Sequence, residues 1–256
     1  MTKVNQILSQ WVADTVSSTK YLQEKGLNSD LLHRYVKSGW IERIGYGAYK
    51  KKFDKIDWQG GLYCLQNQIK LRIHPGGKTA LELHGVTHNL PFKPKITLYG
   101  PSKEKLPRWF KNNFWKDELN YHSFDLFTMN IDPFLQVHEY KNFFILISSP
   151  ELAAFEILFH VPQQQSFSET IKIFENLTTL RFDIVQTLLS NCKSIKVNRI
   201  FLYLADISNH SWFKKIDIST VNLGYGKRVI EQNGRFDGKY NITVPKKNSY
   251  DTEPIY

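Results

Sequence analysis

Two short helix-like segments, joined by a glycine and followed at once by a glycine-centred hairpin, constrain most strongly how this chain can fold. The segment 18–25 starts in Ser17-Ser18-Thr19, whose hydroxyls can cap a helix, and it stops at Gly26, which can adopt a left-handed conformation. A further helix is predicted through Asp30–Lys37, with Asn28 or Ser29 as its cap. The short turn between the two has the spacing of a helix-turn-helix.

The residues on either side of these two helices complete a larger pattern. Apolar side chains within Met1–Val12 recur at spacings of three and four, which predicts an amphipathic first helix. After the third helix, two short strands flank Gly45-Tyr46-Gly47, where the glycines permit the positive φ of a tight turn. A hairpin that directly follows a recognition helix is a wing. Residues 1–55 are therefore predicted to form a winged helix-turn-helix domain.

The polar face of the predicted recognition helix and the basic wing suit contact with DNA. Side chains near the start of such a helix reach base edges in the major groove, where Arg34 could bind guanine with two hydrogen bonds, and basic wing side chains bind phosphates. A protein-interaction module is the alternative reading of the same fold. The predicted DNA-binding residues are Asn28, Ser29, His33, Arg34, Lys37, Arg43, Tyr46, Lys50, Lys51 and Lys52.

The distribution of charge agrees with a polyanionic partner for this segment. The chain of 256 residues has 34 Lys and Arg against 24 Asp and Glu, a formal charge of +10. Residues 1–55 hold eight Lys and two Arg against five acidic residues, so half of the excess lies in about a fifth of the chain. A net charge alone is weak evidence for nucleic-acid binding, but its concentration on a recognition helix and wing is stronger.

The remaining residues, 56–256, are predicted to form one larger domain, rich in strands to about residue 150 and rich in helices after it. Strands followed by helices indicate an α+β fold rather than a doubly wound α/β sheet. The predicted helices cover 58–69, 77–84, 151–160, 168–189 and 197–209, and the predicted strands cover 70–73, 95–99, 121–127, 142–147 and 240–244. The fold class is thus α+β, with an N-terminal winged helix-turn-helix, a larger mixed α/β domain and a helical C-terminal part.

Motifs that could carry catalysis are incomplete in this larger domain. Gly77-Lys78-Thr79 resembles part of a phosphate-binding loop, but Arg72 stands where that loop needs its first glycine. His84 and His88 have a zinc-ligand spacing, yet Gly85 lies between them and the glutamate of a metalloprotease motif is missing. We therefore predict no catalytic residues, no metal, no cofactor and no enzymatic activity.

Two groups of basic residues around aromatic ones leave a further nucleic-acid contact open. The first surrounds Trp109-Phe110, and the second flanks Gly224-Tyr225-Gly226. Basic side chains among aromatic rings can follow a nucleic-acid backbone and stack on bases, but they can equally be an exposed face over a packed ring. The basic residues are Lys103, Lys105, Arg108 and Lys111 in the first group, and Lys214, Lys215, Lys227 and Arg228 in the second.

Apolar runs such as Phe143–Ile147 are far shorter than the roughly 20 residues that cross a bilayer. A signal-peptide pattern is also missing from the polar N-terminus. Cys64 and Cys192 are predicted to be small core residues rather than a disulfide or a metal site. We expect a cytoplasmic protein without a membrane partner.

Three segments together resemble the AbiEi-type antitoxins, which are transcriptional regulators of type IV toxin–antitoxin systems linked to abortive phage infection. They are Leu32–Tyr49 in the winged helix, His74–Gly85 with its Gly-Gly-Lys-Thr-Ala-Leu-Glu-Leu sequence, and Ile96–Gly100. A winged helix occurs in many regulators, so its coupling to the second segment and to a long α/β remainder makes the resemblance more specific.

The resemblance implies a protein with two functions. The winged helix would bind inverted repeats in the promoter of its own operon as double-stranded DNA and repress transcription. Residues 56–256 would be an antitoxin domain that counteracts a nucleotidyltransferase-like toxin without forming a stable complex with it. Two other functions stay open: a nucleotide- or nucleic-acid-processing enzyme that carries a winged helix, and a ligand-responsive repressor without antitoxin activity.

Overall fold

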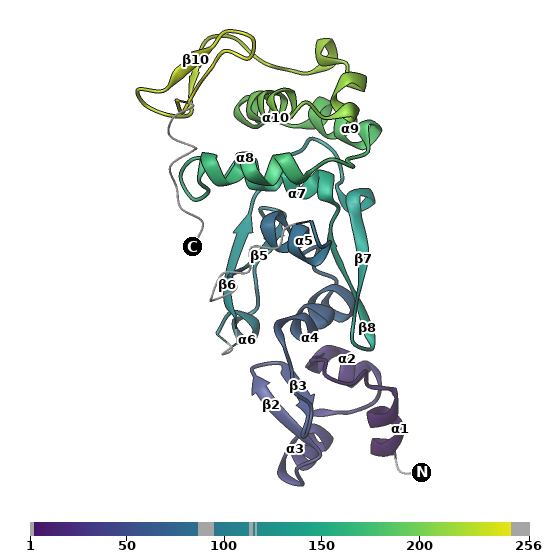
Figure 1. The fold of residues 1–256 in the computed structure, drawn as a ribbon. Coiled ribbons are helices and arrows are strands. Elements are labelled where there is room, and N and C mark those ends of the chain that lie inside the picture. The colour runs from purple at the N-terminus through teal and green to yellow at the C-terminus, as the bar shows by residue number, and fades with distance from the viewer. Residues whose placement is uncertain (1–2, 87–94, 113–114, 116, 247–256) are drawn as a thin grey trace. The chain divides into compact units, whose positions relative to one another are not determined.

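A computed structural model describes residues 3–86, 95–112, 115 and 117–246 (Figure 1). The chain forms two compact units, each built from separate segments of sequence. The first unit contains Met1–Pro75, Leu90–Asp125 and Val137–Ile147, and the second contains Gly76–Asn89, Leu126–Gln136 and Ser148–Tyr256. The predicted domain boundary after residue 55 falls inside the first unit and stays a prediction.

The first unit begins with a winged helix. Its helices are α1 (Lys3–Gln10), α2 (Thr19–Glu24) and α3 (Ser29–Lys37), and its strands are β1 (Ser17–Ser18), β2 (Ile41–Gly45) and β3 (Ala48–Lys51). The strands form an antiparallel sheet in the order β1-β3-β2. The β2–β3 hairpin is the wing, and Figure 1 shows it next to α3.

Local sequence sets the ends of these helices. The hydroxyl of Ser18 accepts a hydrogen bond from the backbone N–H of Tyr21 at 3.2 Å and caps α2, as predicted. Asn28 caps α3 by accepting from the N–H of Leu31 at 2.9 Å. Such caps stabilise a helix by about 1 kcal/mol each because they satisfy N–H groups that lack partners within the helix.

One hydrophobic cluster holds the three helices and the wing together. It consists of Ile7, Trp11, Leu22, Leu27, Leu32 and Ile41, each at most 9% exposed. Burying a leucine or isoleucine side chain stabilises a fold by roughly 1.5–3 kcal/mol. The cluster takes members from every helix of the winged helix and from β2, which fixes the recognition helix relative to the wing.

The rest of the first unit is built on a small mixed sheet. Helix α4 (Trp58–Tyr63) continues into the π-helix η1 (Cys64–Ile69), and strand β4 (His74–Pro75) follows. Strand β5 (Lys95–Gly100) pairs antiparallel with β4 and parallel with β6 (Glu118–Ser123). The short helix α6 (Arg108–Lys111) lies on the connection from β5 to β6, and β7 (Leu135–Tyr140) pairs with β8 (Phe143–Ser148).

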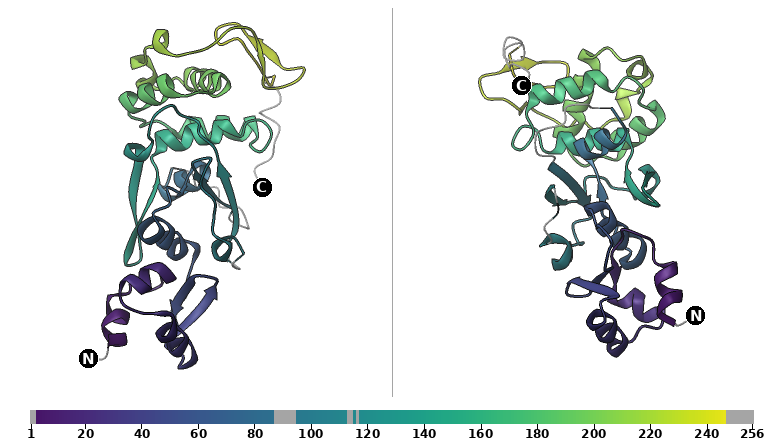
Figure 2. Two further views of the ribbon diagram at one scale, coloured as in Figure 1. Left: turned by 180° about the vertical axis from the view of Figure 1, so that it is seen from behind. Right: turned by 60° about the horizontal axis from the view of Figure 1, so that its bottom comes forward.

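The second unit is mostly helical, as expected for the later part of the chain. Helix α7 is its centre: residues 151–158 are all buried, and α5, α8, α9 and α10 pack against it (Figure 2). Its helices are α5 (Gly77–Leu83), α7 (Pro150–Phe159), α8 (Phe167–Asn176), α9 (Phe182–Asn191), α10 (Ile195–Ile207), η2 (Asp132–Phe134), η3 (Ser211–Lys215) and η4 (Ile218–Thr220). Its strands are β9 (Arg228–Val229), β10 (Arg235–Asp237) and β11 (Ile242–Val244).

Three predicted elements differ from the structure. The expected strand at 70–73 is irregular because Lys70 has a φ of 65° and ends η1, so pairing starts at His74. The expected strand at 121–127 starts and ends earlier, at Glu118 and Ser123. The expected helix at 168–189 is two helices, α8 and α9.

The break between α8 and α9 follows from contacts that a continuous helix would not allow. Leu177 and Leu180 are both buried in the intervening turn. The indole N–H of Trp212 donates to the carbonyl of Leu177 at 2.8 Å, and the backbone N–H of Arg181 donates to Glu151 at 2.9 Å. Tertiary hydrogen bonds therefore satisfy the polar groups released by the break.

Arg181 and Glu151 also form an ion pair with two hydrogen bonds between their side chains. The Nε and Nη2 atoms of Arg181 each donate to one carboxylate oxygen of Glu151 at 3.0 Å. Burial alone would raise the pKa of Glu151, but the hydrogen bonds from the side chain and backbone of Arg181 outweigh it and hold this pKa below its ordinary value. A carboxylate with a lowered pKa stabilises the fold above its unfolded pKa and loses this effect as the pH falls through its folded pKa.

We therefore expect Glu151→Gln to lower the free energy of unfolding by about 1–3 kcal/mol at pH 7, because it breaks a paired contact whose arginine is half exposed. The difference from the unchanged protein should shrink as the pH falls below the ordinary pKa of a glutamate, about 4.3. Urea unfolding between pH 7 and pH 3 measures this. Glu175→Gln, at an exposed position on α8, is the control. A difference that stays constant with pH would contradict the assignment.

Candidate nucleic-acid interface

The solvent-facing side of α3 carries four of the ten residues predicted to bind DNA. Ser29, His33, Arg34 and Lys37 are all exposed, while Leu32 on the opposite side is 2% exposed and packs in the core. The structure thus brings these four side chains together on one helix face, as the 3.6-residue period requires. Asp30 lies on the same face and was not among the predicted residues, although its position in the sequence places it there.

Asn28, which was predicted both as a possible helix cap and as a DNA-binding residue, caps α3. Its side-chain oxygen is used to cap α3. The residue therefore fixes the start of the recognition helix, and its amide N–H₂ is the part of the side chain that this hydrogen bond leaves for other partners.

The wing tip presents an arginine and a tyrosine side by side. Tyr46 is 88% exposed, and the guanidinium of Arg43 lies 5.6 Å from the centre of its ring. The Nε atom of Arg43 donates to the carbonyl of Gly45 at 3.2 Å, which orients the guanidinium toward the tip. A planar cation stacked on an exposed ring suits contact with phosphate or entry into a minor groove.

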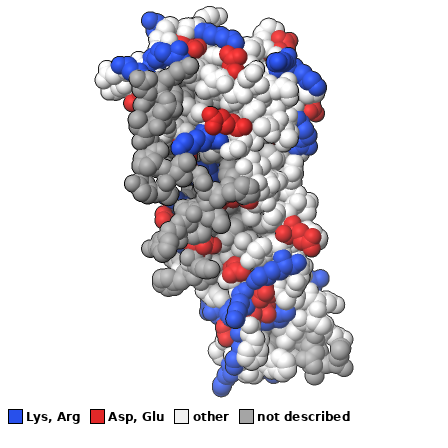
Figure 3. Space-filling model, viewed as in Figure 1, with Lys and Arg blue, Asp and Glu red and all other residues white. Residues whose placement is uncertain are grey.

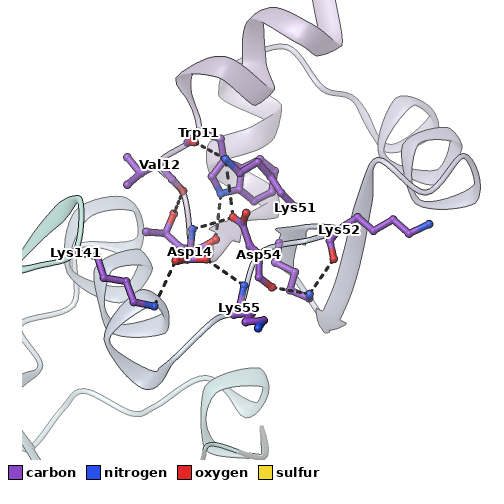
Figure 4. A network of polar contacts seen from close by, with 10 residues as sticks. Trp11, Val12, Asp14, Lys51, Lys52, Asp54, Lys55 and Lys141 are labelled. Atoms are coloured by element: carbon purple, nitrogen blue, oxygen red, sulfur yellow. Dashed lines mark hydrogen bonds and ion pairs between the residues drawn. The ribbon is translucent and has the colours of Figure 1, made fainter.

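The three consecutive wing lysines have different environments, although the sequence alone predicted the same role for all three. Lys50 forms an ion pair with Glu42 at 3.0 Å and donates to the carbonyl of Asp54 at 3.0 Å. Lys51 donates to the carbonyl of Trp11 at 3.1 Å and lies 3.9 Å from the carboxylate of Asp54. The exposed Lys52 extends away from these contacts, as Figure 4 shows.

Lys51 belongs to a polar network that ties the end of the wing to the loop after α1 and to the β7–β8 turn, all within the first unit (Figure 4). The carboxylate of Asp14 accepts from the backbone N–H of Lys55 at 3.1 Å and from Lys141 at 3.3 Å. The carboxylate of Asp54 accepts from the backbone N–H of Asp14 at 2.9 Å. Burial raises the pKa of Asp54 against the lowering effects of this hydrogen bond and of Lys51.

Helix α6 places further basic side chains beside the wing. A Cβ atom on Gly45 would come within 2.6 Å of the Cβ of Trp109, so β2 and α6 are in close contact at this glycine. Trp109 and Phe110 are buried, whereas Lys103, Lys105, Arg108 and Lys111 are exposed. For this basic group the packed-ring reading is correct, because no stacking surface remains on either ring. Arg108 and Lys111 therefore add two exposed cations on the helix that packs against β2.

The charge on the winged helix is mixed rather than uniformly positive. In the space-filling view, Lys and Arg side chains of this region alternate with Asp and Glu side chains (Figure 3). The ion pair between Lys50 and Glu42 is one source of this pattern. Exposed cations on α3, at the wing tip and on α6 therefore contribute more to a positive interface than the formal charge of the Lys50–Lys52 run indicates.

At Gly77-Lys78-Thr79, the segment that resembles part of a phosphate-binding loop, a carboxylate of the chain itself binds a backbone amide. The carboxylate of Glu156, which is 3% exposed, accepts from the backbone N–H of Gly77 at 2.9 Å and from the hydroxyl of Ser148 at 2.9 Å. A carboxylate thus binds the backbone amide that a phosphate would use. Lys78 pairs with Glu169 at 2.6 Å.

His84, one of the two histidines with a zinc-ligand spacing, has a backbone partner instead. His84 contacts the backbone carbonyl of Ser148 at 2.9 Å, and His88 lies outside the described residues. Within the described part of the chain, no group of three or more His, Cys, Asp or Glu side chains is arranged to hold a metal ion. None of the helices in that part combines the length and apolar character that a bilayer crossing needs.

The different roles of two neighbouring lysines lead to a stability prediction. Lys51→Met should lower the free energy of unfolding by about 1–2 kcal/mol, because the carbonyl of Trp11 and the carboxylate of Asp54 lose their cationic partner. Lys52→Met is the matched control and should change stability by less than about 0.5 kcal/mol, as exposed substitutions usually do. Urea unfolding of both variants tests this, and equal losses would contradict the assigned contacts.

Comparison with known proteins supports the fold and identifies the family. No curated protein sequence matches the chain. The crystal structure of the RV2827C protein from Mycobacterium tuberculosis has a similar fold, with a TM-score of 0.56 at 12% sequence identity over 89% of this chain and 85% of that chain. At this identity the likeness concerns the fold alone.

Two family models together match almost the whole chain. Residues 1–92 match the N-terminal domain of the AbiEi antitoxin transcriptional regulators. Residues 93–245 match the model described as transcriptional regulator, AbiEi antitoxin, type IV toxin–antitoxin system. The chain, with its α+β fold and N-terminal winged helix, therefore belongs to the AbiEi antitoxin family of transcriptional regulators in type IV toxin–antitoxin systems.

Proposed function

We propose that this protein binds inverted repeats in the promoter of its own operon and represses transcription. The observation that carries the proposal is the exposed face of α3, where His33, Arg34 and Lys37 lie together next to a wing. Family membership supports a regulatory role, and the exposed polar and basic side chains of α3 support contact with DNA. Occupation of the promoter by the protein would exclude the polymerase.

In this proposal the predicted residues divide the work of recognition. The α3 face enters the major groove, where Arg34 reads a guanine edge and Ser29 and His33 form further hydrogen bonds. Arg43, Tyr46 and Lys52 contact phosphates or the minor groove from the wing. Lys50 and Lys51 act on binding mainly by holding the wing strand in place, and Lys37 adds a phosphate contact at the end of α3.

We expect Arg34→Ala to weaken binding to the operator by about 1–3 kcal/mol and to relax specificity at a single base pair. Lys52→Ala should weaken binding to operator and unrelated duplexes alike and reduce the salt dependence by about one phosphate contact. Fluorescence anisotropy titrations at several salt concentrations measure both effects. Lys172→Ala, an exposed lysine on α8, should leave binding unchanged. Unchanged affinity in the first two variants would refute this DNA-binding surface.

We also propose that the protein counteracts a nucleotidyltransferase-type toxin without forming a stable complex with it. The matched family is described as antitoxins of type IV systems, which supports an effect on a toxin. The second unit and the part of the first unit beyond residue 55 are available for this function, as the predicted antitoxin domain of residues 56–256 implies.

Full-length variants test this second function better than a truncation, because residues 1–55 contact later residues of the first unit. One such contact is the hydrogen bond from the backbone N–H of Val16 to the carbonyl of Gly60 at 3.1 Å. We expect Arg34→Ala to lose repression of an operon reporter while still restoring growth of cells that express the neighbouring toxin. The unchanged protein is the control. If the Arg34 variant fails in both assays although it is present and folded, the two functions are not separable.

A further inference from the structure

The second basic and aromatic group differs from the first in the exposure of its ring. Tyr225 is 99% exposed, whereas Trp109 and Phe110 of the first group are buried. The surrounding segment 211–246 has seven Lys and Arg against three Asp and Glu. Within the described part of the chain, neither Lys227 nor Arg228 forms an ion pair. This region therefore combines available cations with an available ring.

The loop that carries Tyr225 has a fixed backbone. Gly224 and Gly226 on either side of it have φ values of 58° and 73°, a conformation that favours glycine. A Cβ atom on Gly224 would lie 2.4 Å from the Cδ1 of Ile195, so the backbone also packs closely against α10. The tyrosine between these two glycines is almost fully exposed.

A buried arginine holds this loop from below. Arg199 on α10 is 1% exposed, and its guanidinium donates to the carbonyls of Leu223 at 2.7 Å, Gly224 at 3.2 Å and Gly226 at 2.6 Å. It also donates to the carbonyl of Asn241 at 3.0 Å, at the start of β11. All four acceptors are neutral, so these contacts leave the positive charge of Arg199 in place beneath the loop.

The small sheet beside the loop adds apolar side chains to the same surface. Val229 pairs with Thr243, which pairs with Phe236, so the three side chains lie in one row across β9, β11 and β10. Val229 is 64% exposed and Phe236 is 42% exposed. The ammonium of Lys227 lies 4.7 Å from the centre of the Phe236 ring. We call Tyr225, Lys227, Val229 and Phe236 the C-terminal platform; Arg228 pairs with the buried Ile242 and so lies on the other face of the sheet. Figure 1 labels β10 at the position of the platform.

We propose that the C-terminal platform binds single-stranded nucleic acid, with Tyr225 stacking on an unpaired base and Lys227 contacting an adjacent phosphate. An aromatic ring stacks on a base only if that base is not already stacked within a duplex, which favours a single strand over double-stranded DNA. The cationic flank favours a polyanion over an apolar protein surface. The platform consists of residues of the second unit, whereas the winged helix belongs to the first, and the proposal does not depend on operator binding.

The constrained loop explains why such a surface would bind usefully despite its small size. A loop whose backbone is already held by Arg199 loses little backbone freedom when a base stacks on its exposed ring. Because every base has a flat face, stacking on Tyr225 would tolerate many sequences, and the phosphate contact would make the affinity dependent on salt.

The test compares two exposed tyrosines in the full-length protein. Fluorescence anisotropy measures binding to a labelled RNA of about 12 nucleotides, to the DNA strand of the same sequence, and to the corresponding DNA duplex. We expect Tyr225→Ala to weaken binding to a single strand about tenfold and to leave duplex binding unchanged. Tyr46→Ala, at the wing tip, should show the opposite pattern. Tyr225→Phe should retain binding because it keeps the ring.

Each outcome decides the proposal. A Tyr225-dependent preference for RNA or for DNA identifies the sugar, and equal dependence on both indicates recognition by base and phosphate alone; all three support the platform. Unchanged binding of Tyr225→Ala to both single strands would overturn the proposal, and so would an equal loss on the duplex. Because Tyr225 is almost fully exposed, circular dichroism of the variant should match that of the unchanged protein.

Discussion

The hydrogen bonds around Asp14 and Asp54 are the interaction on which the position of the wing depends. They connect the loop after α1 to the segment that leaves β3, and through Lys141 they reach the β7–β8 turn of the same unit. The hydrophobic cluster alone would hold the helices together, but it contains no residue from the end of β3. The network fixes that end, and it does so with two half-buried carboxylates that need cationic and amide partners to be tolerated there.

The winged helix could be predicted well because each of its features is local. The caps, the left-handed glycines and the period of α3 are set by residues within a few positions of one another, so Leu32 and Arg34 could be assigned to opposite faces. The environments of Lys50, Lys51 and Lys52 could not be predicted, because they depend on Trp11 and Glu42, which approach only in the folded domain. Tertiary contacts likewise break the predicted helix between α8 and α9, where Trp212 and Glu151 hold the turn.

The two groups of basic and aromatic residues have similar compositions, but the aromatic rings are buried in the first group and exposed in the second. Trp109 and Phe110 lie on a helix of four residues whose apolar side must be buried, so only the cations remain outside. Tyr225 stands between two glycines with left-handed backbone, and its neighbours contribute no apolar surface to cover it. Gly77 is a similar case. Its sequence is typical of a site that binds an external anion, but its backbone amide binds the carboxylate of Glu156.

The alternation of segments between the two units has a consequence for how the protein is made. The chain leaves the first unit after Pro75, returns at Leu90, leaves again after Asp125 and returns at Val137 for its last strand pair. During synthesis the first unit cannot be complete until residue 147 has left the ribosome, when more than half of the chain already exists. A premature stop within the first half of the gene would therefore leave both units unfinished, so neither could persist as an intact fragment.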